Sequence, residues 1–331
     1  MQPFSYEKVT NEHEAIERAR LGNATFVAGG TTLVDLMKLN VEVPAALVDI
    51  NALPLNQIED QSDGSIRIGA LVRNGDLAQD SRIQSRYRVL SEAILAGASA
   101  QLRNMATTGG NLMQRTRCYY FRDPVYPCNK RQPGAGCAAM DGYNRIHAIL
   151  GASDTCIATH PSDMAVALVA LDASVHIRAA NGERVVPITE FHLLPGDTPD
   201  RETVIRPGEL ITYVTLPSGP FGPRSAYVKL RDRASYEFAL ASAAVALQLE
   251  GTTIRSVRVA LGGVATKPWR AVEAEQVLTG STANEAAFRH AADAALTGAV
   301  PRRYNAYKIE LAKRAIVRAL TDALARATDE N

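Results

Sequence analysis

The feature that most constrains this fold is the placement of the cysteines. The chain has four, Cys118, Cys128, Cys137 and Cys156, and all lie in one stretch. The residues between the first three are rich in Pro, Gly and short polar side chains, so this segment cannot form a long helix or a regular strand. A loop with so little apolar content needs something to wrap around. The clustering therefore indicates that one object binds all four sulfurs.

The spacing of the thiols narrows the choice of object. The gaps between successive cysteines are nine, eight and eighteen residues, and the paired C-x-x-C knuckles of most structural zinc sites are absent from the sequence. Wide, irregular gaps favour a cluster held by a wrapping loop over zinc, free thiols or a disulfide. His147 and His160 lie in or beside the loop, but with four cysteines neither is needed as a ligand. Five basic residues flank the thiols. They could offset the negative charge of the thiolates, or they could simply belong to a solvated basic loop. They are Arg115, Arg117, Arg122, Lys130 and Arg131.

Bulk composition excludes several classes of function. The 331 residues suffice for two or three packed units, and a formal net charge of +1 gives no support for nucleic acid as a partner. The N-terminus lacks a basic region followed by an apolar core, so we expect no secretory signal, and no apolar run approaches the ~20 residues of a membrane span. We therefore expect a cytoplasmic protein, where clustered thiols bind metals more often than they form disulfides.

Residue periodicity predicts an α+β fold. The segment 216–223, with three prolines and two glycines, is a plausible domain boundary. In the last predicted helix one apolar stripe, typical of core packing, comprises Ala312, Ile316, Ala319, Leu320, Ala323 and Leu324. The predicted helices are 32–39, 76–80, 89–105, 164–173, 271–278, 284–296 and 305–327, and the predicted strands are 26–27, 46–50, 65–70, a hairpin over 175–186, 226–231, 239–250 and 253–261.

Two glycine-rich segments are candidate phosphate sites. Glycine lets the backbone approach an anion, and the free amides at a helix start point towards it. Each segment alone is also explained by a tight turn with a helix cap, but two in one chain favour an extended dinucleotide. Neither is the six-residue dinucleotide fingerprint, so a Rossmann fold does not follow. The first segment contains Ala28, Gly29, Gly30, Thr31, Thr32 and Leu33, with Thr31 or Thr32 capping the next helix, and the second contains Thr108, Gly109, Gly110, Asn111 and Leu112 after Thr107.

Further polar residues are candidates near such a ligand. Ser162 and Asp163 open a helix, where most aspartates are caps, although a free carboxylate could bind ribose or ribityl hydroxyls. Lys229 could steady a flavin or its phosphates, or could lie on a solvated strand edge. We find no Ser-His-Asp arrangement, H-E-x-x-H run or P-loop in the sequence. The missing nucleophile or general base suggests a chain that carries electrons.

Five ordered motifs give the whole chain a resemblance to a known family. They are A-G-G-T-T-L at 28–33, T-T-G-G-N-L at 107–112, P-S-D-M-A-V-A-L at 161–168, V-K-L-R-D-R-A-S-Y-E-F-A-L at 228–240 and N-A-Y-K-I-E-L-A-K-R at 305–314. Together they resemble the FAD-binding subunit of the molybdenum hydroxylases, the group of xanthine dehydrogenase and carbon monoxide dehydrogenase. The resemblance implies a vanillyl-alcohol-oxidase-type FAD-binding domain of two subdomains over 1–218, split near residue 55. A small C-terminal α+β domain would follow over 219–331.

The same resemblance implies roles for the glycine segments. The FAD pyrophosphate would lie on residues 28–33 and 108–112, with Asp163 near the ribityl chain and Lys229 at a basic position near the flavin. One departure from the commonest family pattern is an insertion of some forty residues, about 114–158, which contains all four cysteines. It is similar to the insertion that binds a four-iron four-sulfur (4Fe-4S) cluster in 4-hydroxybenzoyl-CoA reductase and, more closely, in bacterial aldehyde oxidoreductases.

The resemblance therefore implies an electron-transfer subunit that carries FAD and a 4Fe-4S cluster. A large partner subunit with a molybdenum cofactor would oxidise an aldehyde, a small partner subunit would carry 2Fe-2S clusters, and an external acceptor would take the electrons. Alternatives are a subunit of a xanthine dehydrogenase or 4-hydroxybenzoyl-CoA reductase-like enzyme, a stand-alone flavin oxidase, and a zinc-stapled flavoprotein module. Export with a signal-bearing partner to the periplasm is the alternative to a cytoplasmic location.

Overall fold

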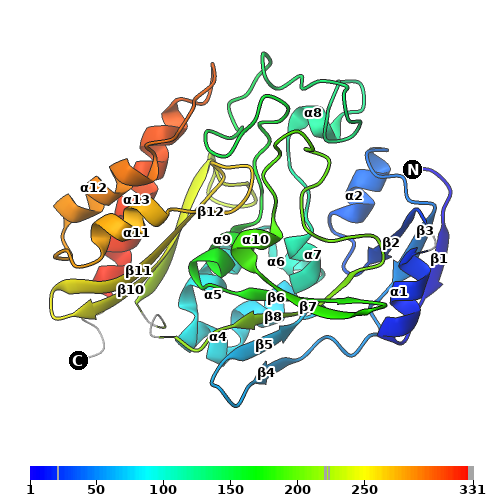
Figure 1. Cartoon of the computed structure of the whole chain (residues 1–331), viewed down its shortest axis with the longest axis horizontal. Coiled ribbons are helices and arrows are strands. Elements are labelled where there is room, and N and C mark those ends of the chain that lie inside the picture. Colours follow the sequence, from blue (N-terminus) through cyan, green and yellow to red (C-terminus); the bar gives the residue numbers. More distant parts are fainter. Residues whose placement is uncertain (21, 220–221, 223, 327–331) are drawn as a thin grey trace.

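The structure, a computed structural model, describes residues 1–20, 22–219, 222 and 224–326. Within these residues the strands form three sheets, which follow one another along the chain and lie from right to left in Figure 1. The α+β fold class expected from the sequence is confirmed. No helix among the described residues is both long and apolar enough to cross a membrane.

The first sheet is parallel and small. Its strand order is β1-β3-β2. Helix α1 connects β1 to β2, and its residues Ala15, Ile16 and Ala19 are buried. Helix α2 starts directly after β2 and the first glycine segment. The elements are β1 (Ser5–Lys8), α1 (Glu12–Arg20), β2 (Ala24–Val27), α2 (Leu33–Lys38) and β3 (Ala46–Asp49).

The second sheet is antiparallel, with strand order β4-β5-β8-β6-β7, and short helices cover it. Its strands are β4 (Ile58–Asp60), β5 (Ile66–Gly69), β6 (Ser174–Ala179), β7 (Gly182–Pro187) and β8 (Leu210–Leu216). Its helices are α3 (Asn74–Gln79), α4 (Ser81–Arg86), α5 (Arg88–Ala96), α6 (Ala100–Arg103), α7 (Thr108–Leu112), α9 (Asp163–Ala170) and α10 (Ile188–Phe191).

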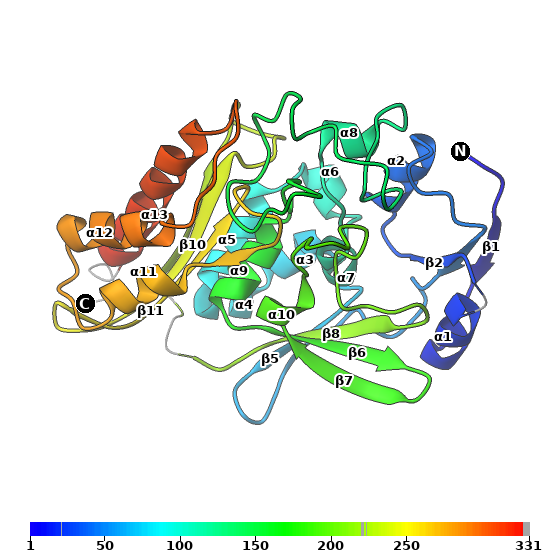
Figure 2. The ribbon, with the colours of Figure 1, turned by 45° about the horizontal axis from the view of Figure 1, so that its top comes forward.

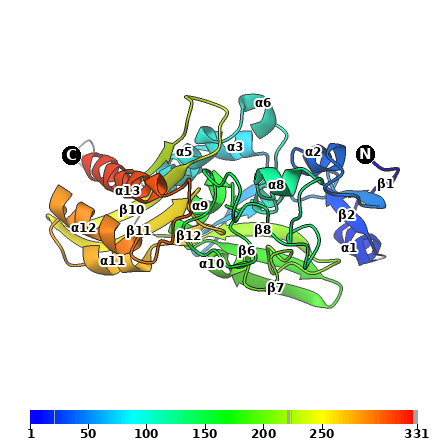
Figure 3. The ribbon, with the colours of Figure 1, turned by 90° about the horizontal axis from the view of Figure 1, so that it is seen from above.

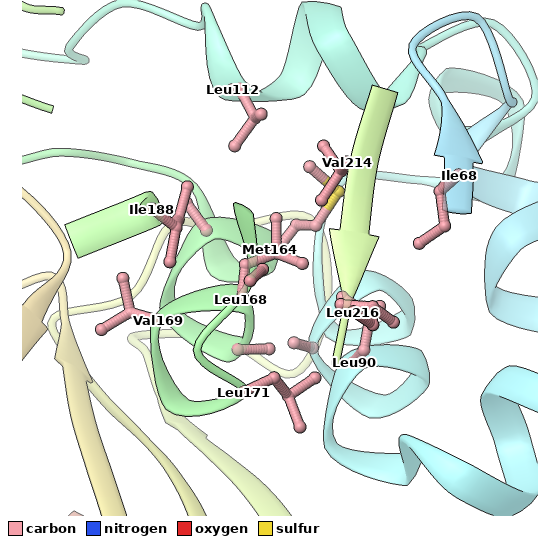
Figure 4. Packing of buried hydrophobic residues seen from close by; sticks show 14 of the residues in the cluster. Ile68, Leu90, Leu112, Met164, Leu168, Val169, Leu171, Ile188, Val214 and Leu216 are labelled. Atoms are coloured by element: carbon pink, nitrogen blue, oxygen red, sulfur yellow. The ribbon is translucent and has the colours of Figure 1, made fainter. Parts of the chain in front are cut away.

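Helix α9 lies at the centre of the molecule because nearly all of its residues are apolar. Every residue from Asp163 to Ala170 is buried. Figure 4 shows Met164 and Leu168 among side chains of β8 and α5. The other side of α9 packs against strands of the third sheet. The residue that opens α9 is therefore held between the second and third sheets.

The third sheet is antiparallel, and the last three helices cover it (Figure 2). The predicted stripe on the final helix is confirmed as core: five of its six residues are buried and Leu324 is partly buried. The elements are β9 (Ser225–Leu230), β10 (Ala241–Glu250), β11 (Thr253–Gly262), β12 (Trp269–Arg270), α11 (Val272–Leu278), α12 (Glu285–Ala295) and α13 (Tyr307–Ala325).

Two local expectations are wrong. The single helix predicted over 89–105 is broken after Ala96, because the chain turns through Ala98 with φ +52° before α6 begins. One explanation for the second glycine segment was a tight turn with a helix cap, yet it forms the short helix α7, because the Thr107 hydroxyl accepts from the Gly110 amide and caps its first turn.

The predicted domain limits stay predictions. The first sheet ends at Asp49 and the second begins at Ile58, while the second ends at Leu216 and the third begins at Ser225. Part of the segment predicted as a boundary lies outside the described residues, namely 220, 221 and 223, as does the predicted helix end at 327.

The cysteine loop, which we define as residues 114–158, is mostly irregular. Its one helix in the described chain is α8 (Tyr119–Arg122). Figures 2 and 3 show the loop lying over the molecule between α2 and the start of α13. It therefore contacts both the glycine segments and the third sheet's helices.

Candidate flavin and cysteine sites

The two glycine segments lie directly against each other. A Cβ on Gly29 would lie 2.0 Å from the carbonyl oxygen of Met105, just before the second segment. Gly30 has φ +68°, a backbone conformation that side chains disfavour. The close approach of the two segments therefore requires Gly29, and the backbone conformation favours glycine at position 30.

The second glycine segment is fixed on the end of β5. The Gly109 amide donates to the Ala70 carbonyl at 2.8 Å, and a Cβ on Gly109 would lie 3.1 Å from that of Ala70. The Thr108 hydroxyl donates to the Val72 carbonyl at 3.2 Å, and the side chains of Thr108 and Leu112 are buried in the core. These two residues can reach a ligand only through their backbone.

Two cavities open on either side of the paired glycine segments. One, of about 290 Å³, has mainly apolar walls and is lined by Ala28, Gly29, Gly30 and Leu33. The other, of about 470 Å³, is more polar. They share Thr31, Thr32, Ala106 and Gly110, so they form one elongated hollow with its waist at the glycines. Polar residues lining the larger cavity include Asp35, Asn74, Asn111, Gln114, Arg117 and Asp163.

The shape and lining of this hollow fit FAD, which is long, apolar at its adenine end and charged in the middle. The amides of Gly109 and Gly110 already donate to the Ala70 carbonyl and the Thr107 hydroxyl. An anion at the waist would therefore meet the amides at the start of α2. Thr32 occupies the cap position of α2, as expected, but its hydroxyl makes no capping bond and stays available to a ligand. Asn74 Oδ1 is buried in the larger cavity and has no hydrogen-bond partner among the described residues.

Ser162 joins the second glycine segment to helix α9. Its hydroxyl accepts from the Ala165 amide at 2.9 Å and donates to Asn111 Oδ1 at 2.6 Å. Residues that are some fifty positions apart in the sequence therefore meet beside the larger cavity, which Asn111 lines.

Asp163 is held by two partners on β9 and also lines the larger cavity. Its carboxylate accepts from Lys229 Nζ at 2.8 Å and from the Tyr227 hydroxyl at 2.5 Å. Burial and the Asp163 charge raise the pKa of Tyr227 well above its ordinary value, so Tyr227 stays protonated and donates. Lys229 also donates to the Ala96 carbonyl at 3.1 Å and lies behind Asp163, so it positions the carboxylate.

Sequence reasoning missed Tyr227, although a signal existed. Tyr227 and Lys229 are two positions apart on one strand, and residues with that spacing share a face of a sheet. A strand prediction that placed Lys229 towards the flavin thus implied the same for Tyr227. The apolar wall formed by Ile205, Leu210 and Ile211 was also missed, because nothing in the sequence connects those residues to the glycine segments.

The four cysteines line one narrow pocket whose other walls are mainly apolar. All four are free thiols, and Cys128 and Cys137 pair as neighbours in a short β-bridge. Backbone amides point at the sulfurs, including that of Ala158 at 3.5 Å from Cys156 Sγ. Burial raises the pKa of Cys118 to about 12, so without a bound metal this thiol is neutral.

No group of three or more His, Cys, Asp or Glu side chains in the described chain is arranged to hold a single metal ion. Zinc gathers its four ligands around one centre. A four-iron cluster binds each thiolate to a different iron and so spaces the thiolates apart. The residue types and their shared pocket fit a cluster, whereas the narrowness of the pocket means the loop must widen to admit one.

The cations expected to offset the sulfur charge are mostly paired with oxygen. Arg115 pairs with Glu42 and Glu202, and both Arg117 and Arg122 pair with Asp35. Arg131 donates to backbone carbonyls at the base of the loop. Lys130 pairs with Glu202 at 3.0 Å and also lowers the pKa of Cys156, against the opposing effect of burial. Of these five side chains, Lys130 is the one with a clear effect on a sulfur.

The two histidines near the loop, His147 and His160, lie in different surroundings. His147 Nε2 lies 3.1 Å from Cys118 Sγ, and burial with the nearby charge of Lys308 lowers the pKa of His147 to about 4. His160 packs against His192, with ring centroids 4.3 Å apart. His160 also lines both a small cleft beside Cys156 and a cavity of about 160 Å³ that reaches Asp163. The cysteine pocket and the candidate flavin cavity are thus close neighbours.

The two ends of the cysteine loop are joined at its root. The Thr116 hydroxyl donates to the Thr159 carbonyl at 2.8 Å, just outside the Ser162–Asn111 hydrogen bond. The loop therefore leaves and rejoins the flavin-binding scaffold at one place.

Comparison with known proteins gives a consistent family. Residues 2–219 match the FAD binding domain in molybdopterin dehydrogenase, and residues 225–323 match the CO dehydrogenase flavoprotein C-terminal domain. The chain is 51% identical to the aldehyde oxidoreductase FAD-binding subunit PaoB of Escherichia coli (strain K12), over 99% of this chain and 100% of that protein. It is 30% identical to the glyceraldehyde dehydrogenase medium chain of Sulfolobus acidocaldarius, over 85% and 83% of the two chains.

A solved structure shares the fold. Carbon monoxide dehydrogenase from Hydrogenophaga pseudoflava contains a chain that is 27% identical and superimposes with a TM-score of 0.77, over 98% of both chains. The elongated hollow, the cysteine pocket and these similarities together define the context in which the two sites act.

Proposed function

The chain belongs to the FAD-binding medium subunits of the molybdenum hydroxylase family, and we propose that it accepts electrons on FAD and passes them to an external acceptor. The observation that carries this proposal is the pair of glycine segments at the waist of one elongated hollow. When bound, FAD supplies the one- and two-electron chemistry that amino-acid side chains lack.

The chain's own residues would bind and orient FAD. The backbone of residues 28–33 and 108–112 would hold the pyrophosphate, and Asn111 would face the ribityl region. Asp163 would accept a hydrogen bond from a ribityl hydroxyl, because Lys229 and Tyr227 fix its carboxylate at the cavity wall. The apolar wall at Ile205–Ile211 would exclude water from the adenine.

Partner subunits would perform the substrate chemistry. Asp163, one of the carboxylates that line the candidate flavin site, is already paired with a buried lysine, so it is poorly suited to act as a base. We propose that a large subunit with a molybdenum cofactor oxidises an aldehyde and that a small subunit with 2Fe-2S clusters delivers the electrons. The 51% identity to an aldehyde oxidoreductase subunit supports this choice over a xanthine dehydrogenase or a 4-hydroxybenzoyl-CoA reductase.

The cysteine loop would hold a second redox centre. We propose that Cys118, Cys128, Cys137 and Cys156 bind a 4Fe-4S cluster, supported by their shared pocket and by the amides directed at the sulfurs. His160 contributes to cavities on both sides, so the cluster would lie next to the flavin. The competing occupant is zinc, which the wide, irregular gaps between the four cysteines in the sequence disfavour.

Metal and flavin analysis of the anaerobically purified full chain tests this function. We expect FAD, iron and acid-labile sulfide, with a visible iron–sulfur absorption. The Cys128→Ser variant should lose iron and keep most FAD, while Tyr126→Phe, a matched change at an exposed side chain of the same loop, should keep both. Zinc in place of iron would rule out the proposed 4Fe-4S cluster. Equal loss of iron and FAD in Cys128→Ser would mean that the loop supports the flavin cavity itself.

A second measurement tests the dependence on partners. The isolated chain should not oxidise aldehydes, whereas the assembly copurified with its neighbouring gene products should. Aldehyde oxidation by the chain alone would show that it is a stand-alone flavin oxidase.

A further inference from the structure

Helix α13 starts with a lysine that is completely buried beneath the cysteine loop. Lys308 has no exposed surface. Its Nζ donates to the carbonyls of Ile146 at 2.9 Å, His147 at 3.0 Å and Gly263 at 2.5 Å. These acceptors satisfy the three hydrogens of an ammonium group but carry no net charge.

Nothing in the described chain neutralises this cation by an ion pair. Arg145, which is paired with Asp232, adds a second positive charge near Lys308. Lys308 also lies in the first turn of the nineteen-residue α13, where the positive end of the helix dipole disfavours a cation. Burial and Arg145 lower the pKa of Lys308 to about 7. A cation in such a place is costly unless an anion lies nearby.

The loop carbonyls that Lys308 contacts lead directly to a thiol. His147 accepts from Lys308 through its backbone, and its ring Nε2 lies 3.1 Å from Cys118 Sγ. Asn305, one turn earlier, donates to the carbonyls of His147 and Ala148, both at 3.2 Å. The start of α13 therefore fixes this part of the loop by two side chains, of which one is charged and one is neutral.

We propose that Lys308 is the buried counter-charge of the four-cysteine site and that it favours the reduced state of the cluster held there. This inference rests on the proposed function, because a 4Fe-4S cluster with four thiolates is the anion that the lysine would offset. Reduction adds one negative charge, so a fixed nearby cation stabilises the reduced state more than the oxidised state. Through His147 the same lysine also positions the ligand Cys118.

A redox titration of the cluster in the full-chain holoprotein, followed by electron paramagnetic resonance, tests the charge. Lys308→Gln retains a hydrogen-bond donor and Lys308→Met retains only the length of the side chain. In both variants we expect the ratio of reduced to oxidised cluster at a fixed potential to fall about tenfold, which is a 59 mV shift for one electron. Lys308→Arg should keep the wild-type ratio.

Asn305→Ala is the matched control, because it removes two hydrogen bonds to the same loop without changing charge. It should leave the ratio unchanged. Wild-type ratios in both uncharged Lys308 variants, or the same shift in Asn305→Ala, would overturn the inference and assign Lys308 to loop packing.

If Lys308→Gln loses iron while Lys308→Arg and Asn305→Ala retain it, the requirement for a charge is supported. If all three lose iron, it is overturned. A wild-type chain without a 4Fe-4S cluster would instead remove the proposed function together with this inference.

Discussion

The glycine segments are shaped by the core beneath them, whereas the cysteine loop is shaped by contacts at its edges. Gly109 and Thr108 bond to strand-end carbonyls, and Leu112 is buried in the central cluster. The cysteine loop has a small apolar cluster of its own, and its fixed points are Lys308 and Asn305 of α13 and the contacts at its root. The flavin cavity is therefore expected to be formed before FAD binds, while the cysteine loop depends on what it encloses.

The largest effect should come from breaking the ion pair behind the flavin cavity. Asp163→Ala leaves the buried ammonium of Lys229 without its partner, which should cost about 3–5 kcal/mol of unfolding free energy and most of the bound FAD. Urea denaturation and flavin absorbance measure both. The control Asp232→Ala breaks an ion pair with Arg145 whose carboxylate side is half exposed, and should cost under about 1 kcal/mol. Similar losses in the two variants would contradict the importance assigned to burial.

A somewhat smaller effect is expected where the two glycine segments touch. Gly29→Ala places a methyl group 2.0 Å from the Met105 carbonyl oxygen, so the segments must separate. We expect a loss of about 2–3 kcal/mol of stability and weaker FAD binding, with iron content retained. Gly298→Ala is the control, because a Cβ there meets no atom within 4 Å. Normal FAD binding in Gly29→Ala would show that the close packing is not needed.

Removing iron should affect the cysteine loop and spare the flavin cavity. After chelation under oxidising conditions we expect proteolysis within 119–145 to accelerate about tenfold or more, which corresponds to about 1.4 kcal/mol of local stability. Val125, which is 86% exposed, marks the first site of cleavage. Cleavage at the exposed turn between β6 and β7 serves as the reference and should not change. An unchanged cleavage pattern would mean that the loop holds its shape without a metal.

The smallest effect is a pH dependence on the flavin side. Burial lowers the pKa of His192 to about 4 from an ordinary 6.5, and its Nε2 contacts the Leu112 carbonyl of α7. The unfolded chain binds this proton first, so stability present above pH 6.5 is lost as the pH falls towards 4. Between pH 7 and 5.5 His192 should contribute about 1 kcal/mol to the loss of stability, so His192→Gln should lose about that much less than the wild type, measured by urea denaturation at the two pH values. Equal slopes in both proteins would assign the acid sensitivity elsewhere.

The sequence predicted the parts of the site that rest on local patterns. Glycine pairs between a strand and a helix identified residues 28–33, and apolar spacing identified the buried face of α13. The Ser162–Asn111 contact depended on the order of family motifs. These features survive in the structure because short-range geometry and burial point to the same arrangement.

The sequence could not show contacts that depend on how distant elements pack. Gly97 and Ser99 are local signals for a helix end and a new helix start, but the sequence does not show that Gly97 packs beside Asp163, where a Cβ would lie 3.2 Å from the carboxylate. The pairing of Arg117 and Arg122 with Asp35, in place of sulfur, required α2 and the cysteine loop to be side by side. Lys308 lies four residues before Ala312 on the buried face of α13, but the carbonyls that accept from its ammonium group belong to distant segments that the sequence does not connect to it.

The root of the cysteine loop has a consequence for how such proteins diverge. Its ends already touch, through Thr116 and Thr159, and the bond between Ser162 and Asn111 closes the scaffold beneath them. A segment with adjoining ends can be exchanged for a short link without moving the elements on either side. A flavoprotein can therefore gain or lose this four-cysteine segment as a single unit, while the scaffold of the candidate flavin site keeps its geometry.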